Sequence, residues 1–140
     1  MDPDNPVVKL CAAGMVAEGE GRGADAKALF EQAWEGSRDD FEACIAAHYV
    51  ARHQATPEAA FEWNERALRR AEAIGADRAH DFFPSLYLNY AHSLEQVGRT
   101  AEACEHYARA ALRVEQLPDS PYKQFVRSGI VAGQARTCRS

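Results

Sequence analysis

Apolar residues recur along this chain at spacings of three and four, which place side chains on one face of an α-helix. Thr56-Pro57 and Ser120-Pro121 each combine a hydroxyl that can cap a helix with a proline that fits its first turn. Glycines interrupt the pattern between its segments. The pattern predicts an all-α protein, with one helix that begins at Asp39 or Asp40 and others over about residues 7–19, 24–37, 57–74, 82–97, 100–116 and 120–136.

The ends of two predicted helices carry further expectations. Residues 1–6 are polar and contain two prolines, so we expect them to fray. Thr100 follows the glycine at position 98 and offers a hydroxyl, which predicts that Thr100 is the N-cap of the helix it precedes.

A small–large–small pattern, with spacings of four and three, occurs three times in the predicted helices. Small outer residues let a neighbouring helix approach closely, and a ring between them fills the gap at the crossing. The first two copies are offset by thirty-four residues and the third by forty-three. The copies are Ala26, Phe30 and Ala33; Ala60, Asn64 and Ala67; and Ala103, Tyr107 and Ala110.

This period and these positions resemble the tetratricopeptide repeat (TPR) family, whose unit is a pair of antiparallel helices of about 34 residues. Three departures concern the middle copy or the whole array: His48 stands where the family has a small residue, Asn64 stands where it has an aromatic, and the closing proline is absent from all three copies. The middle repeat is therefore the least typical. The matching first-helix and turn positions are Leu10, Gly14, Gly21, Tyr87, Ala91 and Gly98.

The resemblance implies a right-handed superhelical array of three antiparallel helix pairs followed by a C-terminal capping helix. The whole chain, residues 1–140, would form one TPR-like domain, with residues 75–81 as an insertion between the second and third pairs. The pairs span about residues 7–40, 41–74 and 84–117, and the capping helix about 120–136.

In the family, the first helix of each pair lines a concave groove. Carried over to this sequence, the groove is a partner-binding site with an apolar strip and a polar end. In the alternative interpretation, the C-terminal helix or the insertion occupies the groove and uses these residues as core. The strip comprises Cys11, Met15, Ile45, Tyr49 and Leu88, the polar end comprises Arg52, His53, Asn89 and His92, and further wall positions are Val8, Glu18, Glu42, Ser85 and Glu95.

Charge narrows the choice of partners. The net charge of −5 lies in the first third, because residues 1–47 carry ten acidic and four basic side chains and residues 48–140 carry eleven and twelve. A nucleic-acid-binding surface needs a basic stripe, so we expect no nucleic-acid partner. The one basic cluster, Arg66, Arg69 and Arg70 with Arg78, is expected to form a solvated helix face paired with Glu62, Glu65 and Glu72.

The four cysteines show no CxxC motif and no close spacing, which argues against a disulfide framework or a zinc site. The apolar segment at residues 10–17 is too short for a signal or membrane segment. These observations predict a cytoplasmic protein with no membrane partner.

No nucleophile motif, phosphate loop or HExxH motif accompanies the five histidines, so we expect neither an enzyme nor a cofactor or metal site. The sequence predicts a non-catalytic module that binds another protein or a peptide segment in the groove. Two alternatives stay open: a sensor of a small peptide or metabolite, and a self-associating homodimer that pairs through Trp34, Phe41 or the Tyr122 and Phe125 face.

Overall fold

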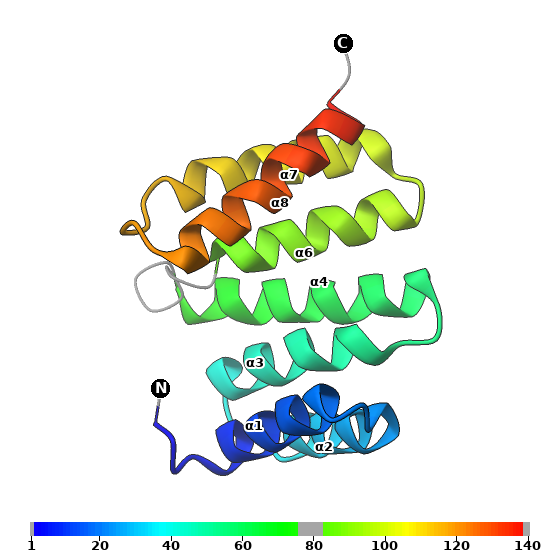
Figure 1. Cartoon of the computed structure of the whole chain (residues 1–140), viewed down its shortest axis with the longest axis vertical. Coiled ribbons are helices and arrows are strands. Elements are labelled where there is room, and N and C mark those ends of the chain that lie inside the picture. The colour runs from blue at the N-terminus through cyan, green and yellow to red at the C-terminus, as the bar shows by residue number, and fades with distance from the viewer. Residues whose placement is uncertain (1, 76–82, 139–140) are drawn as a thin grey trace. The chain divides into compact units, whose positions relative to one another are not determined.

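A computed structural model describes residues 2–75 and 83–138, and this part of the chain is helical, with no strands (Figure 1). The all-α prediction is confirmed for these residues, and the predicted helix ends agree with the structure to within two residues. The chain divides into two compact units, residues 1–74 and 75–140, and each is described by itself.

The first unit is a series of helices in which each packs on the next. α1 packs on α2, α2 on α3 and α3 on α4, and α1 also touches α3. The short 3-10 helix η1 continues α3. The elements are α1 (Pro6–Gly19), α2 (Gly23–Glu35), α3 (Asp40–Val50), η1 (Ala51–His53) and α4 (Pro57–Ile74).

Close packing of α1 against α2 forms the core of the first unit. Gly14 of α1 lies against the ring of Phe30 on α2, so closely that a Cβ at position 14 would overlap the ring. Phe30, Ala26 and Ala33 are fully buried. The small residues therefore let the helices approach until the aromatic ring fills the space between them.

The second unit contains α6 (Phe83–Gln96), α7 (Thr100–Val114) and α8 (Pro121–Thr137), and α8 packs on both α6 and α7. Tyr107 of α7 is fully buried, and a Cβ on Gly133 of α8 would overlap its ring. The Tyr107 hydroxyl donates a 2.8 Å hydrogen bond to Glu95. Burial, together with this bond, raises the pKa of Tyr107 to about 12, so the hydroxyl keeps its proton.

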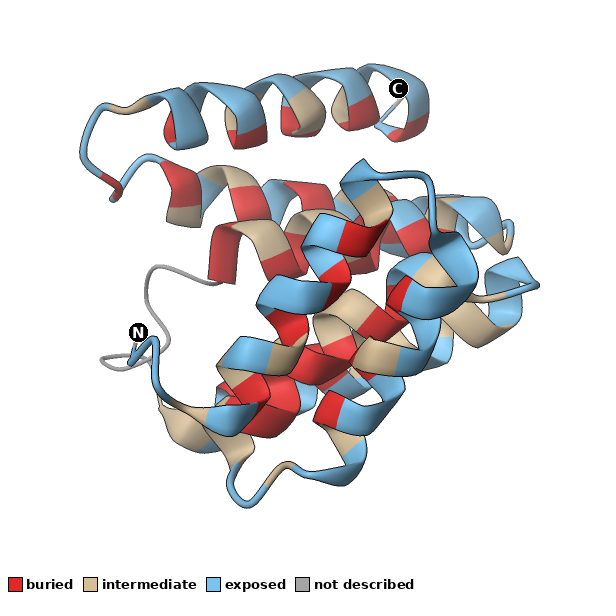
Figure 2. Cartoon of the chain, turned by 60° about the horizontal axis from the view of Figure 1, so that its bottom comes forward, coloured by how far each residue is buried: buried red, intermediate tan, exposed pale blue. Residues whose placement is uncertain are grey.

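In α2, α7 and α8 the buried positions lie along one side of the helix (Figure 2). In α3, by contrast, no residue from position 41 to 50 is exposed. All three small–large–small positions are buried in the first and third copies of the pattern. In the middle copy Ala67 is buried, whereas Ala60 and Asn64 are only half-buried. The sequence departure at Asn64 thus coincides with looser burial of that helix.

Two expectations about helix ends are wrong. Asn5 does not fray: its side-chain oxygen accepts hydrogen bonds from the backbone N–H of Val7 (2.8 Å) and Val8 (3.1 Å) and caps α1. Thr100 is the first residue of α7 rather than its cap, and Arg99 occupies the N-cap position without a side-chain capping bond. Asp39 and Ser120 cap α3 and α8, as the sequence predicts.

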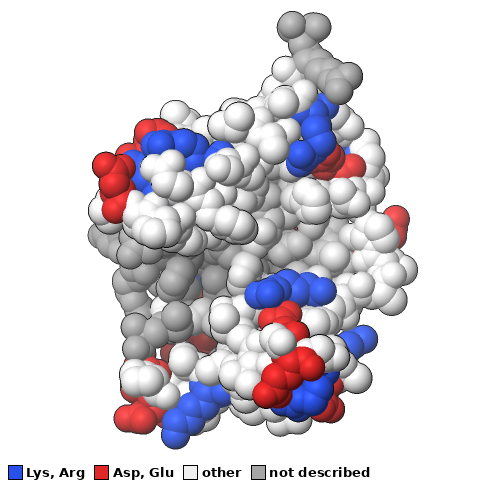
Figure 3. Space-filling view, viewed as in Figure 1, with Lys and Arg blue, Asp and Glu red and all other residues white. Residues whose placement is uncertain are grey.

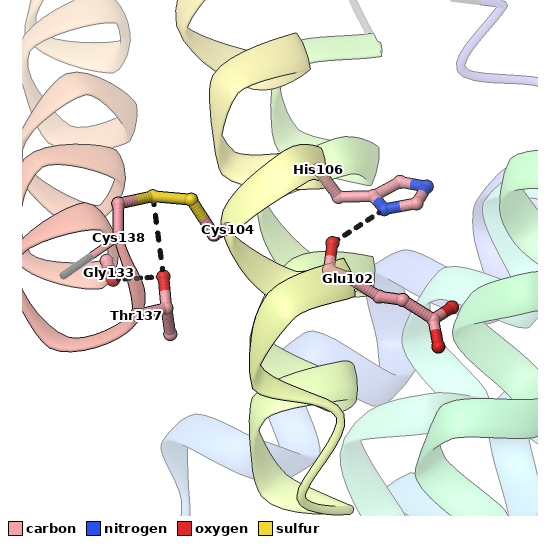
Figure 4. Close-up of a disulfide and its surroundings, with 6 residues drawn as sticks. All are labelled: Glu102, Cys104, His106, Gly133, Thr137 and Cys138. Atoms are coloured by element: carbon pink, nitrogen blue, oxygen red, sulfur yellow. Dashed lines mark hydrogen bonds between the residues drawn. A yellow bond between two sulfur atoms is a disulfide. The ribbon is translucent and has the colours of Figure 1, made fainter. Parts of the chain in front are cut away.

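The argument against disulfides is wrong for one pair of cysteines. Cys104 of α7 and Cys138, which caps the C-terminus of α8, form a disulfide with a Cα–Cα distance of 5.1 Å (Figure 4). The two cysteines lie 34 positions apart in the chain, and only the packing of α8 on α7 brings them together. Cys11 and Cys44 are buried thiols.

Within residues 2–75 and 83–138, no helix is both long enough and apolar enough to cross a bilayer.

Candidate functional site

Six predicted groove residues lie in the first unit, on α1, α3 and η1. We call these residues, together with Glu18, the α1–α3 face: Cys11, Met15, Glu18, Ile45, Tyr49, Arg52 and His53. Because α1 touches α3, the face is continuous across the two helices. The remaining three residues, Leu88, Asn89 and His92, lie on α6 in the second unit.

Tyr49 is the aromatic centre of the α1–α3 face. Its ring stacks on Phe30, with 5.0 Å between centroids and an interplanar angle of 16°. The guanidinium carbon of Arg52 lies 5.4 Å from the Tyr49 centroid, within the range of a cation–π interaction. Burial raises the pKa of the Tyr49 hydroxyl, which therefore remains a neutral hydrogen-bonding group.

Glu18 of α1 holds two basic side chains of the face in place. One carboxylate oxygen lies 3.1 Å from Arg52 Nη2, and the other lies 2.7 Å from His53 Nε2. The His53 ring also lies 5.6 Å from the ring of Phe30. The charge of Arg52 is thereby balanced within the face, while its half-exposed guanidinium can present other N–H groups to a ligand.

Cys11 and Ile45 form the floor of the α1–α3 face rather than its surface. Cys11 belongs to the buried core of the first unit, and Ile45 packs against that core. Burial raises the pKa of Cys11 to about 11, so its thiol stays protonated and is a poor nucleophile. Met15, by contrast, is 48% exposed.

His48 lies behind the face, edge-on to Tyr49 with 5.1 Å between ring centroids. Burial, assisted by the charge of Arg52, lowers the pKa of His48 to about 4. The ring is therefore neutral at pH 7 and packs as an aromatic residue at the position where the TPR pattern has a small one.

On α6, one predicted residue of the apolar strip, Leu88, and two predicted wall positions, Ser85 and Glu95, contact α8. A Cβ on Gly129 would lie 3.1 Å from Leu88 Cδ2, so Leu88 packs closely on α8. The hydroxyls of Ser85 and Tyr122 are hydrogen-bonded to each other. The carboxylate of Glu95 accepts a 2.6 Å bond from Arg136 Nε.

The other two predicted α6 residues differ in exposure. His92 is exposed, and its Nε2 lies 3.4 Å from Gln96 Nε2. Asn89 is half-buried. A groove that combines these residues with the α1–α3 face would take side chains from both units, and it stays a prediction.

An aromatic and basic cluster joins α2 to α4, and it was not predicted from the sequence. The indole rings of Trp34 and Trp63 meet edge-on, with 5.0 Å between centroids. Arg66 lies over Trp63 at 4.3 Å, and Arg70 lies over Trp34 at 5.6 Å. Of the carboxylate pairings expected for this basic cluster, the structure places Glu72 2.7 Å from Arg69. Arginine spaced three or four residues from tryptophan on one helix was the available signal.

Beside this cluster lies a cavity of about 380 Å³ at the turn between α2 and α3. Its charged walls are paired within the protein: Arg70 bonds Asp40 at 3.0 Å, and Arg38 bonds the buried Glu42 at 3.0 Å. The lining residues are Trp34, Ser37, Arg38, Asp39, Asp40, Ala43 and Arg70.

Acidic and basic side chains lie beside one another on the surface drawn in Figure 3. Two exposed ion pairs are Arg22 with Asp25, at 3.0 Å, and Arg99 with Glu102, at 2.6 Å. In the described part of the chain, no group of three or more His, Cys, Asp or Glu is arranged to hold a metal ion. Arg78 and His80 lie outside the described residues.

Comparisons with protein-family models, curated proteins and solved structures found no match to this chain.

Proposed function

We propose that this protein is a non-catalytic module that binds a peptide or protein segment, built as a TPR-like array of three helix pairs and a capping helix. The α1–α3 face is the binding surface of the first unit. Supporting the array are the period of the sequence pattern and the burial of its first and third copies.

The observation that carries this proposal is the setting of Met15. It lies between Cys11 and Glu18 at spacings of four and three along α1, so it shares their side of the helix. Phe30 and Glu18 already hold the neighbouring Tyr49 and Arg52 in place. An exposed apolar side chain beside ordered aromatic and cationic groups can bind a partner with little further loss of conformational entropy.

The charges of the face indicate the chemistry of its ligand. Glu18 balances Arg52, so a carboxylate ligand would have to displace an existing ion pair. An apolar side chain can instead pack on Met15 and Tyr49, while Arg52 donates to a backbone carbonyl. We therefore propose an uncharged segment with one large apolar anchor.

The test is a selection of peptides from a random display library with the whole chain as bait. The affinity of a selected peptide is then measured for the wild type, Met15→Lys and Val16→Lys. Val16 is the matched control, since it is an exposed apolar residue (57%) on the next position of α1. We expect Met15→Lys to weaken binding by about tenfold or more and Val16→Lys by less than about twofold. Equal affinities for both variants would remove the α1–α3 face from consideration.

A second candidate function is self-association through α8. Phe125 is 76% exposed and Tyr122 is 43% exposed. Trp34 and Phe41 are less exposed, since both are half-buried. Large exposed apolar side chains are typical of protein interfaces. If α8 pairs two copies, Phe125→Glu will convert the dimer to a monomer in light scattering and Val131→Glu, at another exposed position of α8, will not. A wild-type mass that stays monomeric at all concentrations excludes this function.

We further propose a cytoplasmic location, where disulfides such as Cys104–Cys138 are in general transient, and no nucleic-acid or membrane partner. The support is the acidic balance of residues 1–47 and the absence of a basic stripe in the sequence pattern. Fractionation of the source cells, with detection of the intact chain, tests the location directly.

A further inference from the structure

The Cys104–Cys138 disulfide joins α7 to the end of α8 (Figure 4). Cys138 is an exposed residue, and Cys104 is half-buried. The other two cysteines, Cys11 and Cys44, are buried in the first unit, and burial raises the pKa of Cys44 to about 12. A thiol reagent therefore meets one accessible sulfur pair and two inert thiols.

The noncovalent packing of α8 is modest for a helix of its length. Its buried side offers two large apolar residues, Val126 and Ile130, and the other buried positions are Lys123, Gly133 and Thr137. Two ion pairs add to these contacts: Arg127 lies 2.9 Å from the exposed Glu115, and Arg136 lies 2.6 Å from Glu95, whose side chain is largely buried. The exposed pair stabilises little, and the disulfide adds a covalent link to this small set of contacts.

The C-terminal half of α8 covers residues of α6 and α7 that would otherwise face solvent. Gly133 lies on the ring of Tyr107, Gly129 lies against Leu88, and Arg136 bonds both Glu95 and the Tyr107 hydroxyl. Loss of this half of α8 would uncover an aromatic ring, an aliphatic side chain and a carboxylate together.

We propose that Cys104 and Cys138 form a thiol–disulfide exchange site for dithiol reductants, and that reduction releases the C-terminal half of α8 from α6 and α7. The disulfide closes a loop between positions that are 34 residues apart. Opening this loop returns conformational freedom to the chain end, and the remaining contacts of α8 compete with that freedom less well. This inference concerns the second unit and is independent of the α1–α3 face.

The exchange proceeds in two balanced steps. A thiolate of the dithiol attacks the exposed Cys138 Sγ, which forms a mixed disulfide and releases Cys104 as a thiolate that takes up a proton. The second thiol of the reagent, as its thiolate, then attacks the reagent's other sulfur, the one bonded to Cys138. This step closes the cyclic disulfide of the reagent and releases the Cys138 thiolate, which is protonated in turn. Two electrons and two protons pass from the dithiol to the protein, and the dithiol leaves as a cyclic disulfide.

The test uses hydrogen–deuterium exchange of the whole chain, oxidised and after treatment with dithiothreitol. We expect the backbone amides of residues 130–137 to lose about tenfold or more of their protection on reduction. The amides of α2, in the first unit, are the internal control and should not change. The Cys104→Ser/Cys138→Ser variant should match the reduced wild type and should not respond to dithiothreitol.

Two results would overturn the proposal. One is alkylation of both Cys104 and Cys138 in protein equilibrated with glutathione disulfide, because the pair would then not form a disulfide. The other is unchanged protection of residues 130–137 in the reduced wild type, because α8 would then stay docked without the bond. Intact-mass analysis after alkylation makes the first measurement before any variant is needed.

Discussion

Glu42 is the residue at which three segments of the first unit meet. Its carboxylate accepts hydrogen bonds from the backbone N–H of Arg38 (2.9 Å), from the Arg38 guanidinium (3.0 Å) and from Asn5 Nδ2 (2.7 Å). The residue is only 3% exposed. The bonds from Arg38 and Asn5 outweigh burial and lower the pKa of Glu42 from 4.5 to about 2. The charged form is therefore built into the fold.

Replacing Glu42 by Gln should reduce the stability of the first unit in a pH-dependent way. The lowered pKa means that the carboxylate stabilises the folded state above about pH 5, and this stabilisation is lost as the pH falls toward 2. We expect Glu42→Gln to lower the free energy of unfolding by about 1.5–3 kcal/mol at pH 7 and by progressively less in acid. Urea unfolding at several pH values measures this, with the exposed Glu31→Gln as control. A loss of equal size at pH 7 and pH 2.5 would contradict it.

Replacing either of two glycines is expected to destabilise the protein, because an aromatic ring lies against each of them. A Cβ at Gly14 would overlap the ring of Phe30, and a Cβ at Gly133 would overlap the ring of Tyr107. We expect Gly14→Ala and Gly133→Ala each to destabilise the protein by roughly 1–3 kcal/mol, although alanine favours helix more than glycine does. Gly19→Ala is the control, since a Cβ there meets nothing within 4 Å. Thermal unfolding of the three variants should separate the first two from the third.

At the scale of elements, Lys123 in the first turn of α8 binds backbone carbonyl groups that follow the end of α7. Lys123 is buried, and its ammonium donates to the carbonyl oxygens of Leu117 (2.8 Å) and Glu115 (3.4 Å) just beyond the end of α7. Carbonyl groups at a helix end lack partners within the helix, so this cation both satisfies them and positions the start of α8.

Lys123→Met keeps the length of the side chain but removes its hydrogen bonds. We expect the variant to destabilise the second unit by about 1–3 kcal/mol, because the buried carbonyl group of Leu117 loses its donor. Arg127→Met is the matched control on α8: it breaks the more exposed pair with Glu115, and we expect a change of less than about 1 kcal/mol. Chemical denaturation of both variants measures the difference. Equal effects would show that Lys123 contributes only an ordinary surface charge.

At the scale of the molecule, the first unit has a core of its own. The buried residues that surround Phe30, including Val7, Ala26 and Val50, all come from residues 1–74. In the second unit, Tyr107 and Ile130 are buried. The cluster around Phe30 gives the first unit an apolar core made from its own residues.

A chain of residues 1–74 alone should remain helical and unfold cooperatively, because the buried cluster around Phe30 is formed by these residues alone. A domain of this size is only marginally stable, so we expect a free energy of unfolding of a few kcal/mol, about 2–5. Circular dichroism during urea titration measures both helicity and cooperativity. Phe30→Ala, which empties the core, should abolish the transition; a helical signal insensitive to Phe30→Ala would contradict the prediction.

Local sequence determined the helices of this protein. The spacings of three and four, and the capping pairs Thr56-Pro57 and Ser120-Pro121, involve residues within about one helical turn of each other. These local signals therefore predicted the helix ends to within two residues. The small–large–small pattern likewise identified Phe30 and Tyr107 as core residues, because a repeated pattern reports which face of a helix is buried.

Tertiary structure decided the contacts between residues far apart in the chain. The Cys104–Cys138 bond, the tie from Asn5 to Glu42 and the pairing of Glu18 with Arg52 and His53 join separate helices. No local pattern encodes such a meeting, since it depends on the angle and distance at which two helices pack. For the same reason, it was the packing of α1 on α3 that decided that Glu18 neutralises Arg52 while Met15 stays exposed.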